Sequence, residues 1–259
     1  MLLNAVIIML REVLEAALLI SVFLALSQLL NRNSWWMLLG LLLGLCGAYV
    51  YAANLSLVSF ALEGTGQEVL NALLHTLIFL ALFTFMLTVP HQQHPQMRLI
   101  NLSAIMIAVV TAITREGAEI ILYIKGFVGI PDLLTPVLIG GSVGAGIGIS
   151  VGVFFYYVLV TLRRNHGIWL GYAMLLLVGG SMMAQAVEFL IQADYITAVS
   201  PLWDSSHLIN ERSVAGQLLY ALIGYEATPA PSQAGAYFGS IILLGLTAYI
   251  SYRYRGKTS

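Results

Sequence analysis

The chain has 259 residues, of which 59% are hydrophobic and 9% are charged, and its formal net charge at pH 7 is −1. A soluble domain averages about 45–50% apolar and about 25% charged residues. The composition therefore excludes an ordinary soluble domain and predicts an all-α integral membrane protein, for which no nucleic-acid partner is expected. The single cysteine, Cys46, excludes an intramolecular disulfide and a thiolate metal cluster.

The first segment, MLLNAVIIML, is predicted to be a retained membrane helix. It has no basic residue before its apolar run, and Arg11 and Glu12 interrupt what would be the core of a cleavable signal peptide.

The rest of the chain alternates between long apolar stretches and mostly short polar connections. A helix that crosses a bilayer needs about 20 mostly apolar residues. The outer loop 194–235 contains the apolar stretch VAGQLLYALIGY, which is too short to span and is predicted to form a surface or re-entrant helix. We therefore expect a single membrane domain, 1–259, with seven transmembrane helices. Their expected bounds are 2–30, 35–60, 69–89, 99–124, 133–162, 168–193 and 236–254.

The basic residues outside these spans predict the orientation of the chain. Short cytoplasmic loops carry an excess of Lys and Arg. One face of the expected bundle carries Arg32, Arg98, Arg163, Arg164, Arg253, Arg255 and Lys257, whereas the opposite face carries only Lys125 and Arg212. The pattern predicts a cell-membrane protein with its N-terminus outside and its C-terminus in the cytoplasm.

The acidic residues outside the spans gather on the expected outer face. They are either the lining of a vestibule that concentrates cations or a result of the avoidance of basic residues on that side, and the sequence leaves both readings open. These residues are Glu63, Glu68, Asp132, Asp194, Asp204, Glu211 and Glu226. Four of them, Asp204, Glu226, Glu63 and Glu68, are candidates for a cation entry path.

The chain contains an internal repeat. REVLEAALLI at 11–20 recurs as REGAEIILYI at 115–124, and the same offset carries the second and third expected helices onto the fifth and sixth. Because each copy, 2–89 and 99–193, holds three spans, the second copy is expected to be inverted in the membrane. Inverted repeats with a site near the membrane midplane are typical of transporters. The helix at 236–254 would follow the two repeats.

Each repeat carries a charged triad inside its first expected helix. Arg11, Glu12 and Glu15 lie within about 100° of arc on a helix with 3.6 residues per turn. The second copy repeats the arrangement with a second Arg-Glu-x-x-Glu, and inversion would place the two triads near the same depth. The residues of the second triad are Arg115, Glu116 and Glu119.

Six charged groups near the middle of a bilayer are unfavourable unless other groups compensate their charge. A charged residue at a bilayer centre costs about 2.5–3.5 kcal/mol even on the lenient insertion scale. The two arginines can neutralise only two of the four glutamates, so either two carboxyl groups are protonated or a cation completes the site. A cage of carboxylate oxygens suits hard cations. A pair of buried ion pairs that only fixes helix packing is the weaker interpretation.

Two Arg-Glu-x-x-Glu motifs, REVLE at 11–15 and REGAE at 115–119, make the chain resemble the oxidase-dependent iron permease family. This family includes the fungal high-affinity iron permease and the bacterial Efe-type permease. The similarity extends through the loop WDSS…GYEATPAPS and covers essentially the whole chain. The resemblance implies a permease, and not an enzyme, that imports iron across the cytoplasmic membrane, with no permanently bound cofactor.

The resemblance also implies residue roles. Carried over by position, Glu12, Glu15, Glu116 and Glu119 would bind iron during passage. Arg11 and Arg115 would hold these carboxylates ionised and oriented, and release them as iron arrives. Because an all-carboxylate site favours the harder ion, ferric iron is the expected cargo. An extracytoplasmic iron oxidase or iron-binding protein is the implied partner, and a homo-oligomer is left open.

Other readings of the same residues remain. Some relatives carry an acid where this chain has Asn71, and Glu188 has no motif role. Glu188 is either an acid near the outer interface or a relay toward the vestibule. Other cargoes, such as lead or manganese, and a proton-coupled carrier of small solutes are alternatives. A membrane di-iron oxidase is disfavoured because such sites draw on Glu-x-x-His pairs, which the chain lacks.

Overall fold

The computed structural model describes residues 2–91, 94–211 and 213–255, and every regular element in these ranges is helical. The all-α prediction is confirmed for this part of the chain. The α-helices are α1 (Leu2–Leu29), α2 (Trp35–Ala53), α3 (Leu55–Phe60), α4 (Gly66–Thr88), α5 (Pro95–Lys125), α6 (Pro131–Thr161), α7 (Arg164–Gln192), α8 (Val214–Ile223) and α9 (Pro231–Arg255), and two short 3₁₀ turns, Leu62–Gly64 and Val89–His91, flank α4.

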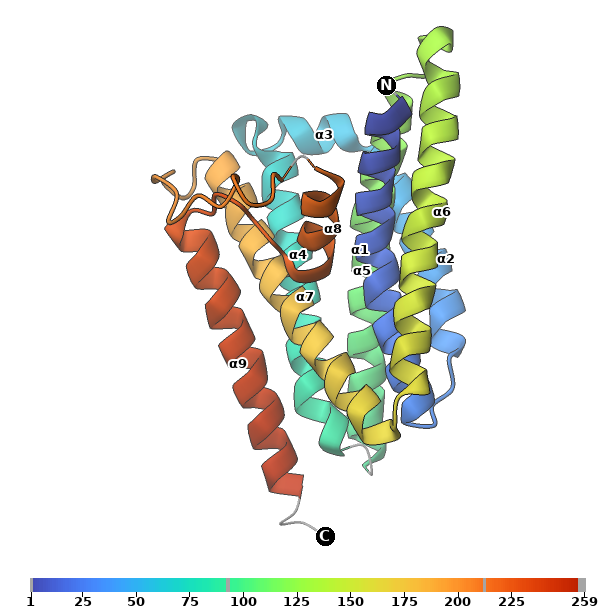
Figure 1. Cartoon of the computed structure of the whole chain (residues 1–259), viewed down its shortest axis with the longest axis vertical. Coiled ribbons are helices and arrows are strands. Elements are labelled where there is room, and N and C mark those ends of the chain that lie inside the picture. Colours follow the sequence, from blue (N-terminus) through green and yellow to red (C-terminus); the bar gives the residue numbers. More distant parts are fainter. Residues whose placement is uncertain (1, 92–93, 212, 256–259) are drawn as a thin grey trace.

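Six helices of the described chain, α2, α4, α5, α6, α7 and α9, are long and apolar enough to cross a membrane. The longest, α5 and α6, have 31 residues each, or about 46 Å at 1.5 Å per residue. The protein is therefore a multi-pass membrane protein. Figure 1 shows these helices running along the long axis of the molecule.

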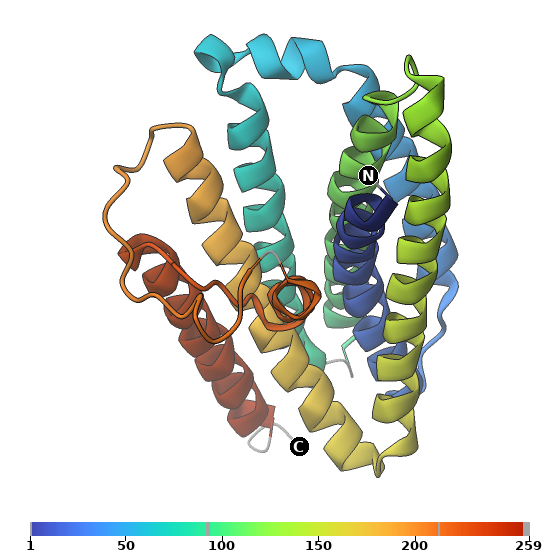
Figure 2. The same cartoon turned by 45° about the horizontal axis from the view of Figure 1, so that its top comes forward.

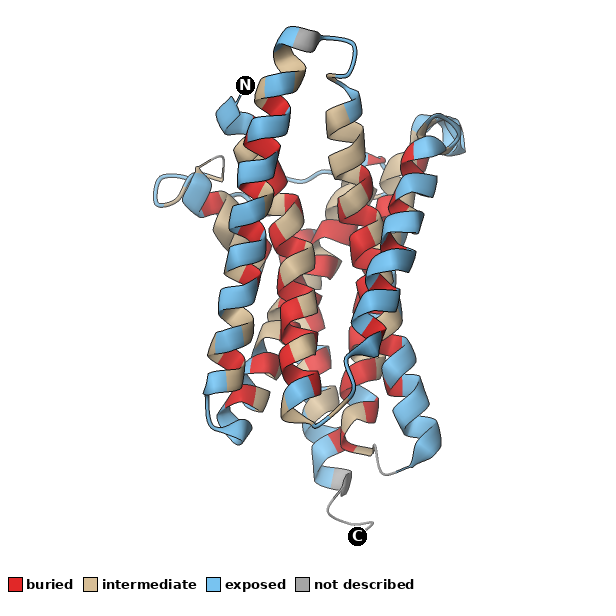
Figure 3. Cartoon of the chain, turned by 90° about the vertical axis from the view of Figure 1, so that its right-hand side faces the viewer, coloured by how far each residue is buried: buried red, intermediate tan, exposed pale blue. Residues whose placement is uncertain are grey.

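Helix α1 is not among these six, although it has 28 residues. It carries three ionisable side chains and lies inside the bundle, packed against α5, α6, α7 and α8. Burial follows the interior faces of the helices, and exposed residues follow the periphery (Figure 3). On α2, for example, Leu38, Leu42 and Leu45 are each about half exposed, whereas Gly40 and Gly44 are buried. Such a pattern fits helices whose outer faces meet lipid tails.

The prediction of one continuous helix over 35–60 is wrong. Helix α2 ends at Ala53, and α3 lies across the long axis at one end of the bundle (Figure 1). Asn54 leaves the helical conformation and its Nδ2 donates to the carbonyl oxygen of Val50 at 2.8 Å. The 19 residues of α2 already give about 28 Å, close to the hydrocarbon thickness of a bilayer. The following LSLVSF therefore turns along the surface, where Leu57 and Phe60 are exposed.

Small residues bring the helices close in two reciprocal pairs. In α6, a Cβ atom added at Gly144 would lie 2.3 Å from the carbonyl oxygen of Val6 in α1. In α2, a Cβ atom added at Gly44 would lie 2.6 Å from Cβ of Ile113 in α5. The first helix of each repeat thus packs against the second helix of the other repeat, and small residues allow this close approach in a membrane.

The two ends of the bundle differ in charge. Helix α1 begins at the end where α3 lies, here called the α3 end, and α9 ends at the opposite end (Figure 1). Lys125 closes α5 at the α3 end. The opposite end carries Arg32, Arg98, Arg163, Arg164 and Arg253. Arg212 and Lys257, which the predicted orientation also counted, lie outside the described residues.

Candidate metal site

The two charged triads lie on α1 and α5, which contact each other inside the bundle. Both motifs lie inside long apolar helices, so their i, i+3 and i, i+4 spacings place the charged groups on one side of each helix. On the other side of α5, a Cβ atom added at Gly117 would lie 2.8 Å from Cβ of Ala48 in α2. Close packing of α5 on α2 leaves its charged face turned toward α1.

Arg115 connects the two helices. Its Nη1 lies 2.6 Å from Oε1 of Glu116 and 3.3 Å from Oε2 of Glu15, and its Nη2 lies 3.0 Å from Oε1 of Glu119. One buried guanidinium group therefore contacts three carboxylates, one of them on the other helix. Arg11 adds a second contact to Glu15, with its Nε 3.3 Å from Oε1.

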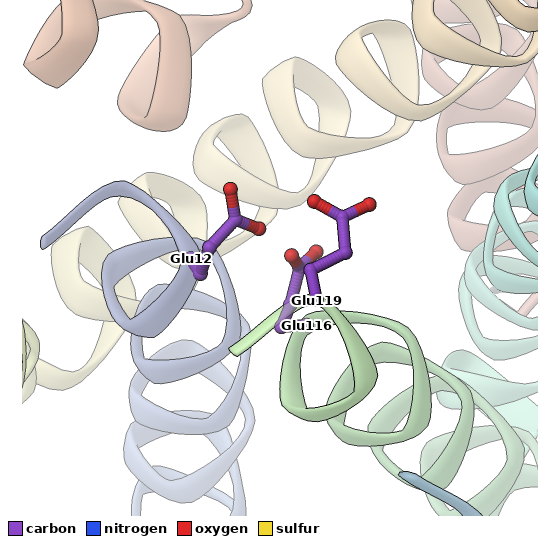
Figure 4. Close-up of side chains that lie close together, drawn as sticks. All are labelled: Glu12, Glu116 and Glu119. Atoms are coloured by element: carbon purple, nitrogen blue, oxygen red, sulfur yellow. The ribbon is translucent and has the colours of Figure 1, made fainter. Parts of the chain in front are cut away.

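The remaining carboxylate oxygens converge on one point. Glu12, Glu116 and Glu119 each offer an oxygen, and these three oxygens lie within 4.8 Å of one another. Figure 4 shows Glu12 reaching from α1 toward the two glutamates of α5. Oε2 of Glu12 and Oε2 of Glu116 are buried and have no hydrogen-bond partner among the described residues. Acceptor oxygens left unpaired in the interior are a binding site for a group that donates protons or carries positive charge.

The charges of the site do not balance. Four carboxylates and two guanidinium groups carry a formal charge of −2 when all are ionised. Glu12 takes part in none of the ion pairs of the described chain. Because the interior of a membrane protein does not accept uncompensated charge, the arrangement requires either protonated carboxyl groups or a bound cation next to Glu12.

A hollow of about 430 Å³ opens beside the triads. Its lining is mixed, with charged, amide and aromatic side chains from α1, α4, α5, α7 and α8. Glu188 contributes to the wall, and its Oε1 accepts a hydrogen bond from Nε2 of Gln192 at 3.1 Å. The lining residues are Ile8, Arg11, Glu12, Gln67, Asn71, Arg115, Glu119, Leu122, Tyr123, Glu188, Phe189, Gln192 and Tyr220.

Helix α8 covers part of this hollow. It packs against α1 and α7 (Figure 2), and the guanidinium of Arg11 lies 4.0 Å from the ring centroid of Tyr220. This cation–π distance is favourable. Ser213 caps the helix by accepting from the N–H of Gly216 at 3.0 Å, and Gly224 ends it in the left-handed conformation, with φ 67°. Both ends of α8 are therefore fixed, so Tyr220 is held over Arg11.

A buried hydrogen-bond network supports the wall of the hollow. Oδ1 of Asn71 accepts from the hydroxyl of Tyr51 at 3.0 Å. His75 has both ring nitrogens in hydrogen bonds, to the carbonyl oxygen of Asn71 at 2.7 Å and to Oε1 of Gln185 at 3.0 Å. This histidine is fully buried. It therefore joins α4 to α7.

The comparison with protein families gives one decisive match. The model of the iron permease FTR1 family matches residues 2–255. The chain belongs to the iron permease FTR1 family. The expected family is confirmed, and it is a family of iron permeases. No curated protein and no solved structure matched the chain in the corresponding searches.

Within this iron permease, the four predicted entry residues have different surroundings. Glu63 is exposed in the turn after α3, and Glu68 lies in the first turn of α4 with Oε2 buried and unpartnered in the described chain. Asp204 is exposed, and Oδ1 accepts two hydrogen bonds from Ser206, which lower the pKa of Asp204.

The fourth entry residue, Glu226, differs most from an exposed acid. Burial raises the pKa of Glu226 to about 7, and the neighbouring carboxylate of Glu188 acts in the same direction. Oε1 of Glu226 accepts a hydrogen bond from Nε2 of Gln233 at 3.1 Å. Glu226 is thus a half-buried loop residue whose carboxyl group is influenced by the carboxylate of Glu188.

Only three of the four predicted metal-binding glutamates converge in the structure. Glu12, Glu116 and Glu119 come together, whereas the carboxylate of Glu15 is held by the two arginines. Sequence reasoning gave no role to Tyr220, since an aromatic in an apolar stretch carries no signal of its own. Sequence reasoning also did not predict which polar residues line the hollow together. The sequence signal for them was the presence of polar side chains within apolar helices, at Gln67, Glu188 and Gln192.

Proposed function

We propose that the chain imports iron across the cell membrane through the carboxylates of Glu12, Glu15, Glu116 and Glu119. The observation that carries the proposal is the convergence of three acidic oxygens from two helices, two of them on residues with a buried, unpaired second oxygen. The excess of carboxylate over guanidinium and the membership of an iron permease family support it.

The spacing of the oxygens suits an ion after a small adjustment. Two oxygens that bind one metal ion at about 2.0–2.2 Å lie at most about 4.4 Å apart. The oxygens of Glu12, Glu116 and Glu119 lie within 4.8 Å of one another, so rotations about side-chain bonds are sufficient to close the site. A ring of carboxylates favours a hard ion, and we infer that ferric iron is the cargo.

Arg115 takes the position of a cation in the structure. Its guanidinium contacts Glu15, Glu116 and Glu119 and lies 5.9 Å from the ring centroid of Phe189. We infer that arriving iron displaces Arg115 from Glu116 and Glu119, while Glu15 retains the guanidinium. With all six side chains ionised, the formal charge of the site would change from −2 to +1 when a ferric ion binds, so the ion would compensate the excess of carboxylate.

The architecture proposed for this function has seven spans and two inverted repeats. The close pairs α1–α6 and α5–α2 support the inverted relation, because they exchange under the offset that superposes the two motifs. Helix α1 would be the seventh span, kept from lipid by its neighbours so that its charged residues face the interior. The repeats would be 2–89 and 99–193, followed by the loop 194–235 and the last span, 236–254.

We further propose that the α3 end faces the outside of the cell. The basic residues of the opposite end support this orientation. Iron would enter past Asp204, Glu226, Glu63 and Glu68, supplied by an extracytoplasmic iron oxidase or iron-binding partner. A cysteine placed at Asp132 should react with a membrane-impermeant thiol reagent in whole cells, and protection of that cysteine would reverse the orientation.

Iron uptake into vesicles that contain the purified protein tests the function. Glu12→Gln and Glu116→Gln keep the shape of the side chain and remove its charge. Each should lower uptake at least about tenfold, because even outer partners of a metal site cost about 10- to 100-fold in affinity when they are lost. Glu63→Gln should weaken uptake only slightly, since its side chain is exposed and far from the oxygen cluster.

Asp132→Asn is the matched control, because this acid lies exposed in the first turn of α6 at the same end. Its uptake should equal that of the natural protein. Uptake that persists after replacement of all four motif glutamates would refute the site. Equal uptake of ferrous iron when oxidation is blocked would refute the ferric cargo, and stronger competition by manganese or lead than by iron would assign a different metal.

A further inference from the structure

The end of the bundle opposite the α3 end is rich in arginine. A cavity of about 520 Å³ lies there between α1, α2 and α5. Its polar wall includes Arg32, Asn33 and Arg98. Its apolar wall includes Leu99, Leu102 and Ile105. Neither the triads nor the hollow of about 430 Å³ shares a residue with it.

Arg32 is held in this wall by a buried support. Its Nη1 donates to Oδ1 of Asn101, which is fully buried. The side-chain amide of Asn101 donates in turn to Oγ1 of Thr88 at 2.8 Å and to the carbonyl oxygen of Phe85 at 3.2 Å. Arg32 is therefore positioned by α4 and α5. Its other terminal nitrogen, Nη2, is buried and has no acceptor among the described residues.

The cavity concentrates positive charge without a carboxylate to balance it. Burial and the neighbouring Arg98 lower the pKa of Arg32, which shows that the two guanidinium groups share one region. The sequence contains no Asp or Glu from residue 16 to 62 or from 69 to 115, so α2 and most of α5 offer none. Among the described residues, no carboxylate balances these two arginines.

Two helix N-termini add to the positive potential. Asn33 and Trp36 of the cavity wall flank the start of α2, and Pro95 and Arg98 lie in the first turn of α5. The N-cap residues of the two helices make no side-chain cap. The first amide of α2, that of Trp35, donates to Oδ1 of Asn33 at 3.3 Å, and the amides that follow it in the first turn have no side-chain cap. Free N–H groups and the helix dipole favour an anion at such a place.

We propose that this cavity binds an acidic membrane phospholipid, with its phosphodiester between Arg32 and Arg98. The apolar wall decides between a lipid and a free phosphate. Leu99 and Leu102 are 66% and 41% exposed and run from Arg98 along α5 toward the buried Ile105, which gives an acyl chain a continuous apolar path. Arginine suits the phosphoryl group because its donors match phosphate oxygens in pairs. This site is independent of the cargo of the permease.

Native mass spectrometry of the purified protein tests the proposal. The protein is stripped of lipid in detergent and then offered equal amounts of phosphatidylglycerol and phosphatidylcholine. We expect retention of phosphatidylglycerol over phosphatidylcholine by at least about fivefold, which is the preference that one arginine near an anionic surface provides. Arg98→Gln should abolish this preference without unfolding the protein, since the Arg98 side chain is exposed.

Arg253→Gln is the matched control, since it removes the same charge from an exposed position of α9 at the same end. It should leave the preference unchanged. Equal retention of the two lipids, or a preference that Arg98→Gln leaves intact, would overturn the proposal. Displacement of phosphatidylglycerol by millimolar inorganic phosphate would overturn the lipid in favour of a free-anion pocket. Because the assay contains no iron, its failure leaves the proposed transport unaffected.

Discussion

At the scale of residues, Arg115 pairs with more carboxylates than Arg11, the other arginine of the site, does. It is 2% exposed and contacts three carboxylates. Loss of one partner from a buried ion pair leaves a charge without compensation, which typically costs about 3–5 kcal/mol. The Arg115 contacts therefore decide whether the carboxylate cluster is tolerated in the absence of a bound metal.

Arg115→Gln should accordingly lower the free energy of unfolding by about 3–5 kcal/mol, measured as the thermal midpoint of the protein in detergent. Arg11→Gln should cost less, because Arg11 has one carboxylate partner and its side chain is 28% exposed. The double variant Arg115→Gln, Glu116→Gln should recover part of the loss, since it removes one of the unpaired charges. An Arg115→Gln protein as stable as the natural one would contradict this balance.

The sequence predicted the acidic residues better than their individual partners. Repetition of the motif and its helical spacing predicted that two charged faces meet, and the contact between Arg115 and Glu15 joins them. The division of the four glutamates was not predictable, because it depends on which rotamers allow one guanidinium to reach three carboxylates. Glu188 and Tyr220 enter the hollow from α7 and α8, and their positions follow from tertiary packing rather than from a motif.

At the scale of elements, the glycine ridge of α6 determines how closely this helix approaches α1. Gly144 and Gly148 face the backbone of α1, whereas Gly146 faces outward and has no atom within 4 Å of an added Cβ. The two kinds of glycine lie in one helix only two residues apart. Replacing either glycine by alanine adds the same methyl group, so a comparison of the two variants tests the packing alone.

Gly144→Ala should destabilise the protein by about 1–3 kcal/mol, the usual cost of overpacking, because its Cβ would lie 2.3 Å from the carbonyl oxygen of Val6. Gly146→Ala should be neutral or slightly stabilising, since alanine forms helices better than glycine. Thermal unfolding of the two variants in detergent measures the difference. Equal stability of the two variants would show that α1 and α6 do not pack as described.

The elements themselves were largely predictable, and the exceptions have a physical cause. Apolar length predicted the long helices to within a few residues at most ends, and the short stretch in the loop forms α8. The error at 35–60 arose because LSLVSF is as apolar as a membrane span. Hydropathy does not register the turn at Asn54, where the side-chain amide is a second donor, beside the backbone N–H, to the carbonyl oxygen of Val50.

At the scale of the whole molecule, the two ends of the bundle differ in charge. The hollow beside the triads includes Glu188 in its wall, whereas the cavity at the other end includes Arg32 and Arg98. In the proposed orientation, an acidic entrance would attract cations, and the basic opposite end would anchor the protein in an acidic leaflet. Both features follow from the uneven distribution of a small number of charged residues.

We propose that iron is held by Glu12, Glu116 and Glu119 on its way through the bundle. Anomalous scattering at the iron absorption edge, measured from crystals soaked in iron, tests it most directly. The account predicts a single strong peak between these three carboxylates, with Arg115 turned away from Glu116 and Glu119, and no such peak in Glu12→Gln crystals. A peak elsewhere in the bundle, or none in a protein that still transports iron, would contradict it.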